Sequence, residues 1–206
     1  MHFHRRLALA AAILAFAVIS LGAFVRLSDA GLGCPDWPGC YGHWLGVPEE
    51  SHEQLAANQV FPERPVNTGK AWKEMIHRYF AGTLGLLILA IFLYAWRKEM
   101  RHRQSPILPT VLLATVGLQA ALGMWTVTLL LKPVIVTLHL LGGMTTLALL
   151  LTLLLRDAGT APASNLPLWL RPLAAMMLLL IIAQIALGGW VSSNYAALAC
   201  PDFPLC

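Results

Sequence analysis

Five long apolar stretches are the feature that most constrains how this chain can fold. They cover about residues 7–25, 77–96, 108–128, 134–155 and 168–191. Each is close to the roughly 20 residues that an α-helix needs to cross the hydrocarbon core of a bilayer. Because lipid offers no hydrogen bonds to the backbone, such segments cross a membrane as helices. The sequence therefore predicts an all-α integral membrane protein with five spanning helices.

The composition excludes an ordinary soluble domain. Hydrophobic residues make up 58% of the chain and charged residues only 12%, whereas charged residues make up about 25% of a typical soluble domain. The cluster His4-Arg5-Arg6 precedes the first stretch as it would in a signal peptide, but that stretch is long and lacks a convincing small-residue cleavage site. We expect it to remain as the first helix.

Basic residues gather at the helix ends that face one side of the membrane. These residues are Arg5, Arg6, Arg97, Lys98, Arg101, Arg103, Arg156 and Arg171. Since Lys and Arg are enriched in cytoplasmic loops, the N-terminus is predicted to be cytoplasmic. The four cysteines then face the outer, periplasmic-type side of the plasma membrane, where disulfides persist. The net charge of +4 is accounted for by this topology, so the lipid bilayer is the expected partner and no nucleic acid is inferred.

The chain also repeats itself. The segment 22–40 returns as 188–206, and both cysteine pairs, Cys34 with Cys200 and Cys40 with Cys206, are 166 residues apart. A repeat with a constant offset indicates a tandem duplication.

The duplication predicts how the helices are grouped. Residues 1–160 should form one four-helix bundle with an outer loop at 34–73. Residues 161–206 should hold a linker, the fifth helix and the start of a second, homologous bundle. The site of that second unit is expected to be largely missing from these 206 residues.

Two histidines fall inside spanning segments. His77 lies near the outer end of the second segment, and His139 lies about one and a half turns inside the outer end of the fourth. Both segments run inward, so the imidazoles are expected at the same depth. Ionisable groups inside a membrane are functional candidates by default, and imidazole pairs in helical bundles commonly hold haem iron. The alternative is a structural pair that hydrogen-bonds to backbone carbonyls of neighbouring helices.

Other residues bear on this choice. Zinc fits less well, because no third or fourth ligand is expected at that depth. Glycines near the histidines would let a flat porphyrin approach, although small residues also serve helix packing; they are Gly82, Gly85, Gly142 and Gly143. The remaining histidines are predicted to be solvated in tails or loops: His2, His4, His43, His52 and His102.

Glu74 precedes His77 by three residues, which places both on one helix face. It is either a catalytic carboxylate that moves protons or stabilises positive charge, or an interfacial anchor paired with a nearby base. The candidate bases are Lys70, Lys73 and Arg78.

Cys34 and Cys40 enclose a short loop that contains two prolines. An intraloop disulfide is geometrically reasonable there, with a structural or a redox role. Cys200 and Cys206 are a possible second disulfide.

Taken together, these motifs resemble the haem A synthase family. The resemblance rests on residues 22–40, on Glu74 with His77 and Arg78, and on His139, and it spans essentially the whole chain. It implies an oxidoreductase of haem biosynthesis that oxidises the C8 methyl of haem O to the formyl group of haem A by successive hydroxylations, for cytochrome oxidase assembly.

The resemblance also implies an architecture. It implies eight helices in two bundles, with haem O as substrate in the first and haem b as cofactor in the second. His77 and His139 would be axial ligands of the haem iron, Glu74 the catalytic carboxylate, and Cys34 with Cys40 the outer-loop pair. The electron donor is not indicated; haem O synthase and cytochrome oxidase assembly factors are candidate partners.

The sequence departs from the family in length, because the histidines of the second bundle would fall beyond residue 206. We therefore expect this chain alone to bind at most one haem and to make no haem A. Two alternatives remain: a non-catalytic bis-histidine b-type membrane cytochrome that passes electrons from quinol, and a haem-binding or haem-transport module. Product analysis would separate the three.

Overall fold

The computed structural model describes residues 2–101, 105–157, 167–196 and 199, and every regular element in these ranges is a helix. Five helices are long and apolar enough to cross a membrane. They are α1 (His2–Leu27), α3 (Thr68–Ala95), α5 (Ile107–Thr128), α6 (Pro133–Asp157) and α7 (Leu170–Ser193). Two short helices, α2 (Ser51–Val60) and α4 (Lys98–Arg101), complete the set. The predicted all-α membrane fold with five spanning helices is confirmed.

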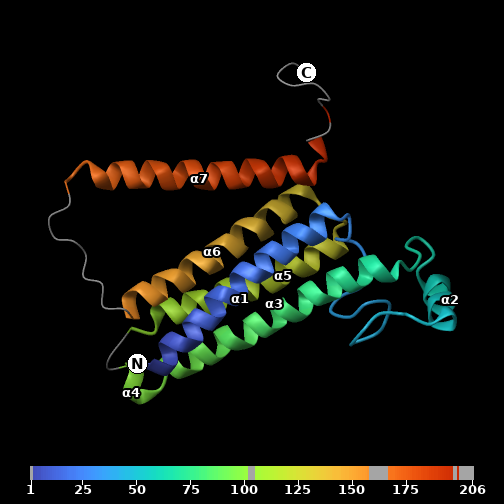
Figure 1. Ribbon diagram of the computed structural model, residues 1–206, viewed down its shortest axis with the longest axis horizontal. Helices are drawn as coiled ribbons and strands as arrows, with labels where there is room; N and C mark the ends of the chain where they lie inside the picture. Colours follow the sequence, from blue (N-terminus) through green and yellow to red (C-terminus); the bar gives the residue numbers. More distant parts are fainter. Residues whose placement is uncertain (1, 102–104, 158–166, 197–198, 200–206) are drawn as a thin grey trace.

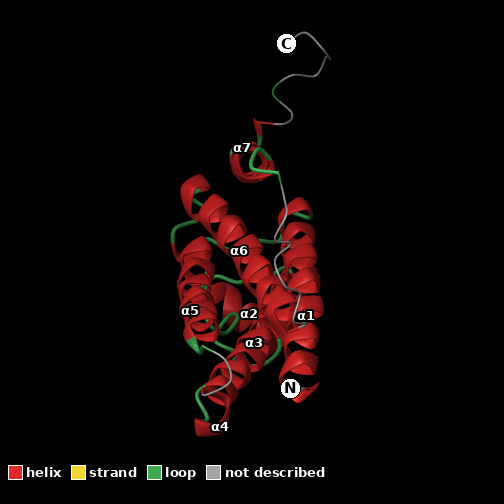
Figure 2. Ribbon diagram, turned by 90° about the vertical axis from the view of Figure 1, so that its left-hand side faces the viewer, coloured by secondary structure: helices red, strands yellow, loops and turns green. Residues whose placement is uncertain are grey.

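Four of the long helices form a bundle. α1 packs against α3 and α6, and α5 packs against the same two helices (Figures 1 and 2). α3 and α6 therefore lie across the bundle from each other. α1 and α5 end where α3 and α6 begin; we call this end, which carries the Cys34 loop and α2, the cysteine end, and the opposite one the N-terminal end.

The apolar core fills the half of the bundle nearer the N-terminal end. α1 contributes alanines spaced three and four residues apart, a small-residue face that lets neighbouring helices approach closely. Larger aliphatic side chains of the other three helices pack against it. The fully packed cluster comprises Ala8, Ala11, Ala12, Ala15, Leu84, Ile88, Ile91, Leu112, Leu150 and Leu153. Nearer the cysteine end, the interior also holds His77 and His139, each against a glycine.

The segment between α1 and α3 is more structured than the predicted outer loop. It contains α2, whose start has a capping box: Glu53 accepts from the backbone N–H of Glu50, 3.2 Å away. α3 begins at Thr68, nine residues before the apolar run, and the Asn67 side chain caps it by accepting from Lys70 N, 3.0 Å away. Glu74 therefore lies in the second turn of a long helix.

α7 is arranged differently from the bundle helices. It lies at an angle to them and approaches α6 at its C-terminal end (Figure 1). A Cβ on Gly189 would lie 3.0 Å from Leu140 Cδ2, so the two helices cross closely at this glycine.

Equivalent positions of the two repeat copies touch at the cysteine end. The Arg26 guanidinium donates to the Ser192 carbonyl and lies 4.2 Å from the centre of the Tyr195 ring. The Tyr195 hydroxyl donates to Asp29 Oδ1, 3.3 Å away. The pairs Arg26 with Ser192 and Asp29 with Tyr195 are each 166 residues apart. The two copies thus meet through the same part of their shared motif.

Candidate functional site

His77 projects from α3 onto a glycine of α1. A Cβ added at Gly22 would lie 3.0 Å from His77 Cε1, so any larger residue there would displace the imidazole. Gly22 is five residues before the end of α1, which sets the ring a little more than one turn inside the cysteine end.

His139 has a matching environment on the other side of the bundle. It projects from α6, and a Cβ added at Gly123 of α5 would lie 3.5 Å from His139 Cε1. Gly123 is five residues before the end of α5. The structure therefore places the two histidines that the sequence selected at the same end of the bundle, on α3 and α6, each flanked by a glycine from a different helix.

Both rings have a nitrogen available to a ligand. The Nδ1 atoms of His77 and His139 are buried and have no hydrogen-bond partner among the described residues. A buried nitrogen without a partner costs free energy unless a ligand or water satisfies it. Two imidazoles from opposed helices, with glycines beside them, suit bis-histidine coordination of a haem. The residues therefore fit the group that the sequence indicated.

The glycines that flank the histidines are not the ones expected from the sequence. A Cβ on Gly82 would have no atom of the described residues within 4 Å, and one on Gly85 would meet only Val116. Gly22 and Gly123 lie beside the rings instead. A signal for both was present in the sequence: Gly22 belongs to the repeated motif, and Gly123 lies in residues 119–125, which resemble residues 184–190.

Gln119 is a polar residue that the sequence reasoning did not assign to the site. Its side chain reaches Gly142, one turn beyond His139 on α6, and occupies the space that a larger residue at 142 would need. Its Nε2 atom is buried without a partner among the described residues. Gly142 therefore accommodates a side chain of the protein.

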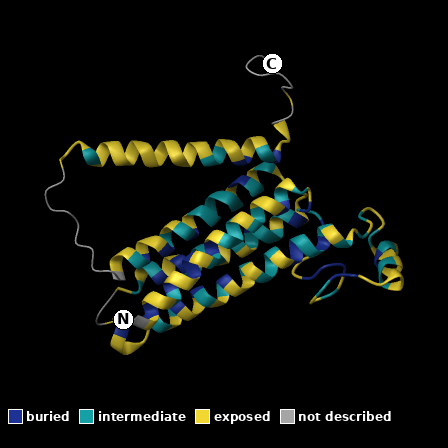
Figure 3. Ribbon diagram, in the orientation of Figure 1, coloured by how far each residue is buried: buried dark blue, intermediate teal, exposed yellow. Residues whose placement is uncertain are grey.

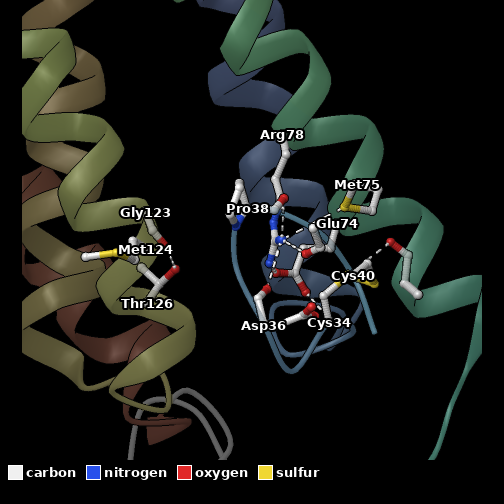
Figure 4. A network of polar contacts seen from close by, with 12 residues as sticks. Cys34, Asp36, Pro38, Cys40, Glu74, Met75, Arg78, Gly123, Met124 and Thr126 are labelled. Atoms are coloured by element: carbon white, nitrogen blue, oxygen red, sulfur yellow. Dashed lines mark hydrogen bonds and ion pairs between the residues drawn. A yellow bond between two sulfur atoms is a disulfide. The ribbon is translucent and has the colours of Figure 1, made fainter. Parts of the chain in front are cut away.

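Glu74 is engaged by the Cys34 loop. The residue is 5% exposed. Its Oε2 accepts from the Cys34 backbone N–H, 2.9 Å away, and Oε1 forms an ion pair with Arg78 Nη2 at 2.5 Å (Figure 4). Of the three bases that the sequence offered, Arg78 is its partner. Lys70 pairs with Asp29 instead, at 2.7 Å.

Arg78 fastens the loop to α3. Its Nη1 donates to the carbonyls of Asp36, Pro38 and Gly39, at 3.0, 3.2 and 2.5 Å (Figure 4). Cys34 and Cys40 form a disulfide that closes this loop. The second expected pair, Cys200 and Cys206, lies outside the described residues.

Within the loop, the Asp36 carboxylate accepts from the backbone N–H of Tyr41 at 2.6 Å and of Gly42 at 2.8 Å. The disulfide loop is thus held from inside by Asp36 and from the helix by Glu74 and Arg78.

Ionisable groups beyond the spanning helices also respond to their surroundings. Burial raises the pKa of the Tyr41 hydroxyl. The hydrogen bond and charge of Lys70 lower the pKa of Asp29. The backbone N–H groups of Glu49 and Glu50 lower the pKa of Glu53. At pH 7 the carboxylates of Asp29 and Glu53 are therefore charged and the Tyr41 hydroxyl is neutral.

One prediction about the histidines was wrong. His4 was expected to be solvated in the N-terminal tail, but it lies within α1, is 2% exposed and stacks on Tyr94 with ring centroids 5.7 Å apart. It is at the N-terminal end, far along the bundle from His77 and His139. His102 lies outside the described residues.

Residues 5–206 match the family COX15-CtaA, described as cytochrome oxidase assembly protein. The chain belongs to this family. The match includes α1 to α7 almost entirely, so the bundle, the histidine pair and the disulfide loop all lie within the matched region.

Individual relatives are named heme A synthase. The one from Shewanella oneidensis is 49% identical over 195 residues, which cover 92% of this chain and 57% of the relative. Those from Chelativorans sp. and Bacillus licheniformis are 31% and 29% identical, over 92% and 90% of this chain. The chain spans 57% of the length of each of the three. No solved structure gives a significant match.

Proposed function

We propose that this chain carries the first haem-binding unit of a haem A synthase, an oxidoreductase that converts haem O to haem A for cytochrome oxidase. The observation that carries the proposal is the histidine pair. His77 and His139 come from opposed helices at the same end of the bundle, and both have a buried nitrogen without a partner among the described residues. The relatives named heme A synthase support the choice of reaction.

His77 and His139 would hold the haem iron from its two sides. Gly22 and Gly123 let the two imidazoles lie directly against α1 and α5 inside the bundle. Haem O bound there would supply the C8 methyl that two hydroxylations and loss of water turn into a formyl group. The haem b cofactor is assigned to the second unit of the complete protein.

Glu74 is proposed as the carboxylate that serves the reaction near His77. Both of its oxygens already have partners, Cys34 N–H and Arg78. A proton that Glu74 takes up would therefore share the carboxylate with these partners. This couples the carboxylate to the position of the disulfide loop.

The cysteine end is proposed to face outward, with the N-terminus in the cytoplasm. Basic residues at the N-terminal end favour this orientation, as does the Cys34–Cys40 disulfide at the other end. Haem O synthase and cytochrome oxidase assembly factors are proposed as partners.

Haem titration into the detergent-solubilised chain tests the ligands. The chain should bind one haem with a six-coordinate bis-imidazole spectrum, and His77→Ala or His139→Ala should abolish that spectrum. His52→Ala is the matched control, because His52 lies on the exposed helix α2. If both single variants kept the wild-type spectrum, the ligand assignment would be wrong.

Haem O conversion by the complete protein tests the carboxylate. Glu74→Gln keeps an acceptor for Cys34 N–H, and conversion should still fall about 100-fold or more, as for loss of a general acid or base. Arg78→Lys is the control, because it loosens the loop and leaves the carboxylate in place.

Equal loss of conversion in both variants, with the haem spectrum intact, would mean that Glu74 only positions the loop. Normal haem A formation by Glu74→Gln would favour a structural anchor and withdraw the catalytic role.

A further inference from the structure

The chain that follows the disulfide loop, residues 41–48, runs along the side of α3; we call it the cysteine loop. Pro48 O accepts from the Thr68 hydroxyl in the first turn of α3, at 3.2 Å. Two residues earlier in the chain, the Gly46 N–H donates to the Tyr79 hydroxyl, 2.8 Å away. Tyr79 is eleven residues into a helix that rises about 1.5 Å per residue. The chain therefore runs down beside α3 instead of projecting away from it.

The part of this loop nearest to Tyr79 carries two exposed apolar side chains. Trp44 is 79% exposed and Leu45 is 80% exposed. Gly46 follows with φ +83°, a conformation that favours glycine and turns the chain back toward α2. We call residues 44–46 the loop tip. In a soluble protein two such adjacent side chains would be costly to leave in water.

The loop covers a helix face that continues into lipid. Met75 and Tyr79 lie on the face of α3 that the loop packs against. The same face continues at spacings of three and four residues through Gly82, Leu86 and Leu93. A Cβ on Gly82 would have no described atom within 4 Å, and Leu86 is 69% exposed. The loop tip thus lies where protein cover on this face gives way to bilayer.

The length of α3 fixes the depth of the tip. Its 28 residues span about 42 Å at about 1.5 Å per residue, whereas the hydrocarbon core is about 30 Å thick. With Ala95 at one boundary, the other boundary falls about 20 residues back, near Met75. The Tyr79 hydroxyl, on a side chain that points back toward the helix start, then lies close to the boundary between headgroups and acyl chains.

We propose that the loop tip is a membrane anchor: Trp44 and Leu45 insert into the bilayer leaflet beside α3, at the boundary between headgroups and acyl chains. Tryptophan is enriched at this depth, because its ring is apolar and its indole N–H can reach water or headgroups. The anchor gives the disulfide loop a second attachment, to lipid, in addition to the attachment to Arg78. The partner is the lipid surface itself, independent of which reaction the protein catalyses.

Spin labelling in phosphatidylethanolamine and phosphatidylglycerol vesicles tests the anchor. In a background in which Cys200 and Cys206 are serine, a nitroxide is attached at Leu45→Cys, and its collisions with oxygen and with a water-soluble nickel chelate are compared. Two matched controls are Leu86→Cys, on the lipid-facing part of α3, and Leu55→Cys on α2, which is 65% exposed. Mass mapping of Cys34 with Cys40 checks that each variant keeps its loop.

The Leu45 label should favour oxygen over nickel severalfold more than the Leu55 label, and should approach the Leu86 label. A nickel accessibility equal to that of the Leu55 label would place the tip in water and overturn the proposal. Shielding from both reagents would mean that a protein surface covers the tip, which would overturn it equally.

A milder variant gives a second measurement that does not depend on labelling. Trp44→Phe keeps an aromatic ring, so folding should be unaffected. Brominated lipids quench tryptophan emission from within the bilayer, and the quenched part of the emission should be smaller in Trp44→Phe than in the wild type. Unchanged quenching would contradict insertion of Trp44.

Discussion

The two copies of the repeated motif have very different surroundings. In the most apolar 18-residue stretch of α1, 28% is buried, whereas in the corresponding stretch of α7 only 6% is buried (Figure 3). Gly22 of the first copy faces the His77 imidazole, while a Cβ on its equivalent, Gly188, would have no described atom within 4 Å. The comparison shows that the motif acquires its role from the neighbour it faces. Among the described residues, Gly22 has a histidine beside it and Gly188 has none.

The largest difference is expected between substitutions at the two equivalent glycines, Gly22 and Gly188. Gly22→Leu forces its side chain into the space of His77, and overpacking costs about 1–3 kcal/mol. Because about 1.4 kcal/mol is tenfold in affinity, haem binding should weaken about tenfold or more. Gly188→Leu should leave it unchanged. Haem titration followed by Soret absorbance measures both, and equal weakening by the two variants would show that the glycine is not specific to the histidine site.

A smaller effect is expected from a pair of equivalent alanines. Ala8 is fully buried in the bundle core, and its equivalent, Ala174, is exposed on α7. Ala8→Leu should lower the free energy of unfolding by about 1–3 kcal/mol through overpacking. Ala174→Leu should stay within about 0.5 kcal/mol of the wild type. Unfolding in detergent, followed by circular dichroism, measures the difference; a destabilising Ala174→Leu would show that α7 packs more tightly than its exposure indicates.

The smallest effect concerns Asp29, which pairs with Lys70 and also accepts a hydrogen bond from Tyr195 near the second copy. Lys70 lowers the pKa of Asp29 below its usual 3.8, so this ion pair stabilises the fold above that pH, and its contribution is lost as the pH falls through the lowered pKa. Asp29 is largely exposed, so Asp29→Asn should cost at most about 1 kcal/mol at pH 7.

The gap between wild type and Asp29→Asn should narrow as the pH falls below 3.8, as thermal unfolding at pH 7 and at lower pH would show. A gap that stayed constant with pH would mean that the Asp29 charge does not contribute.

Much of the fold followed from the sequence because hydrophobicity acts locally. The five spanning helices are confirmed within a few residues at most ends, and the disulfide between Cys34 and Cys40 is present. α2 was missed because its ten residues show no apolar run. The start of α3 was missed because its first turns are polar, and they are helical through the Asn67 cap.

The site was harder to predict, because it depends on which helix faces which. The histidines were selected correctly as residues within the bundle, but that Gly22 and Gly123 lie beside them follows only from the order of the helices. The burial of His4 depends likewise on Tyr94 being beside it. Arg78 could not be assigned to the loop from the sequence, since its acceptors are backbone carbonyls, which every residue carries.

That use of backbone acceptors determines which substitutions the disulfide loop can accommodate over evolution. Arg78 recognises the path of the chain at Asp36, Pro38 and Gly39 through their carbonyls. Trp37, whose side chain is partly exposed, can therefore be substituted without loosening the attachment to Arg78. Gly39 cannot, because any Cβ there would run into the His43 carbonyl. The loop tolerates change in its side chains and resists change in its course.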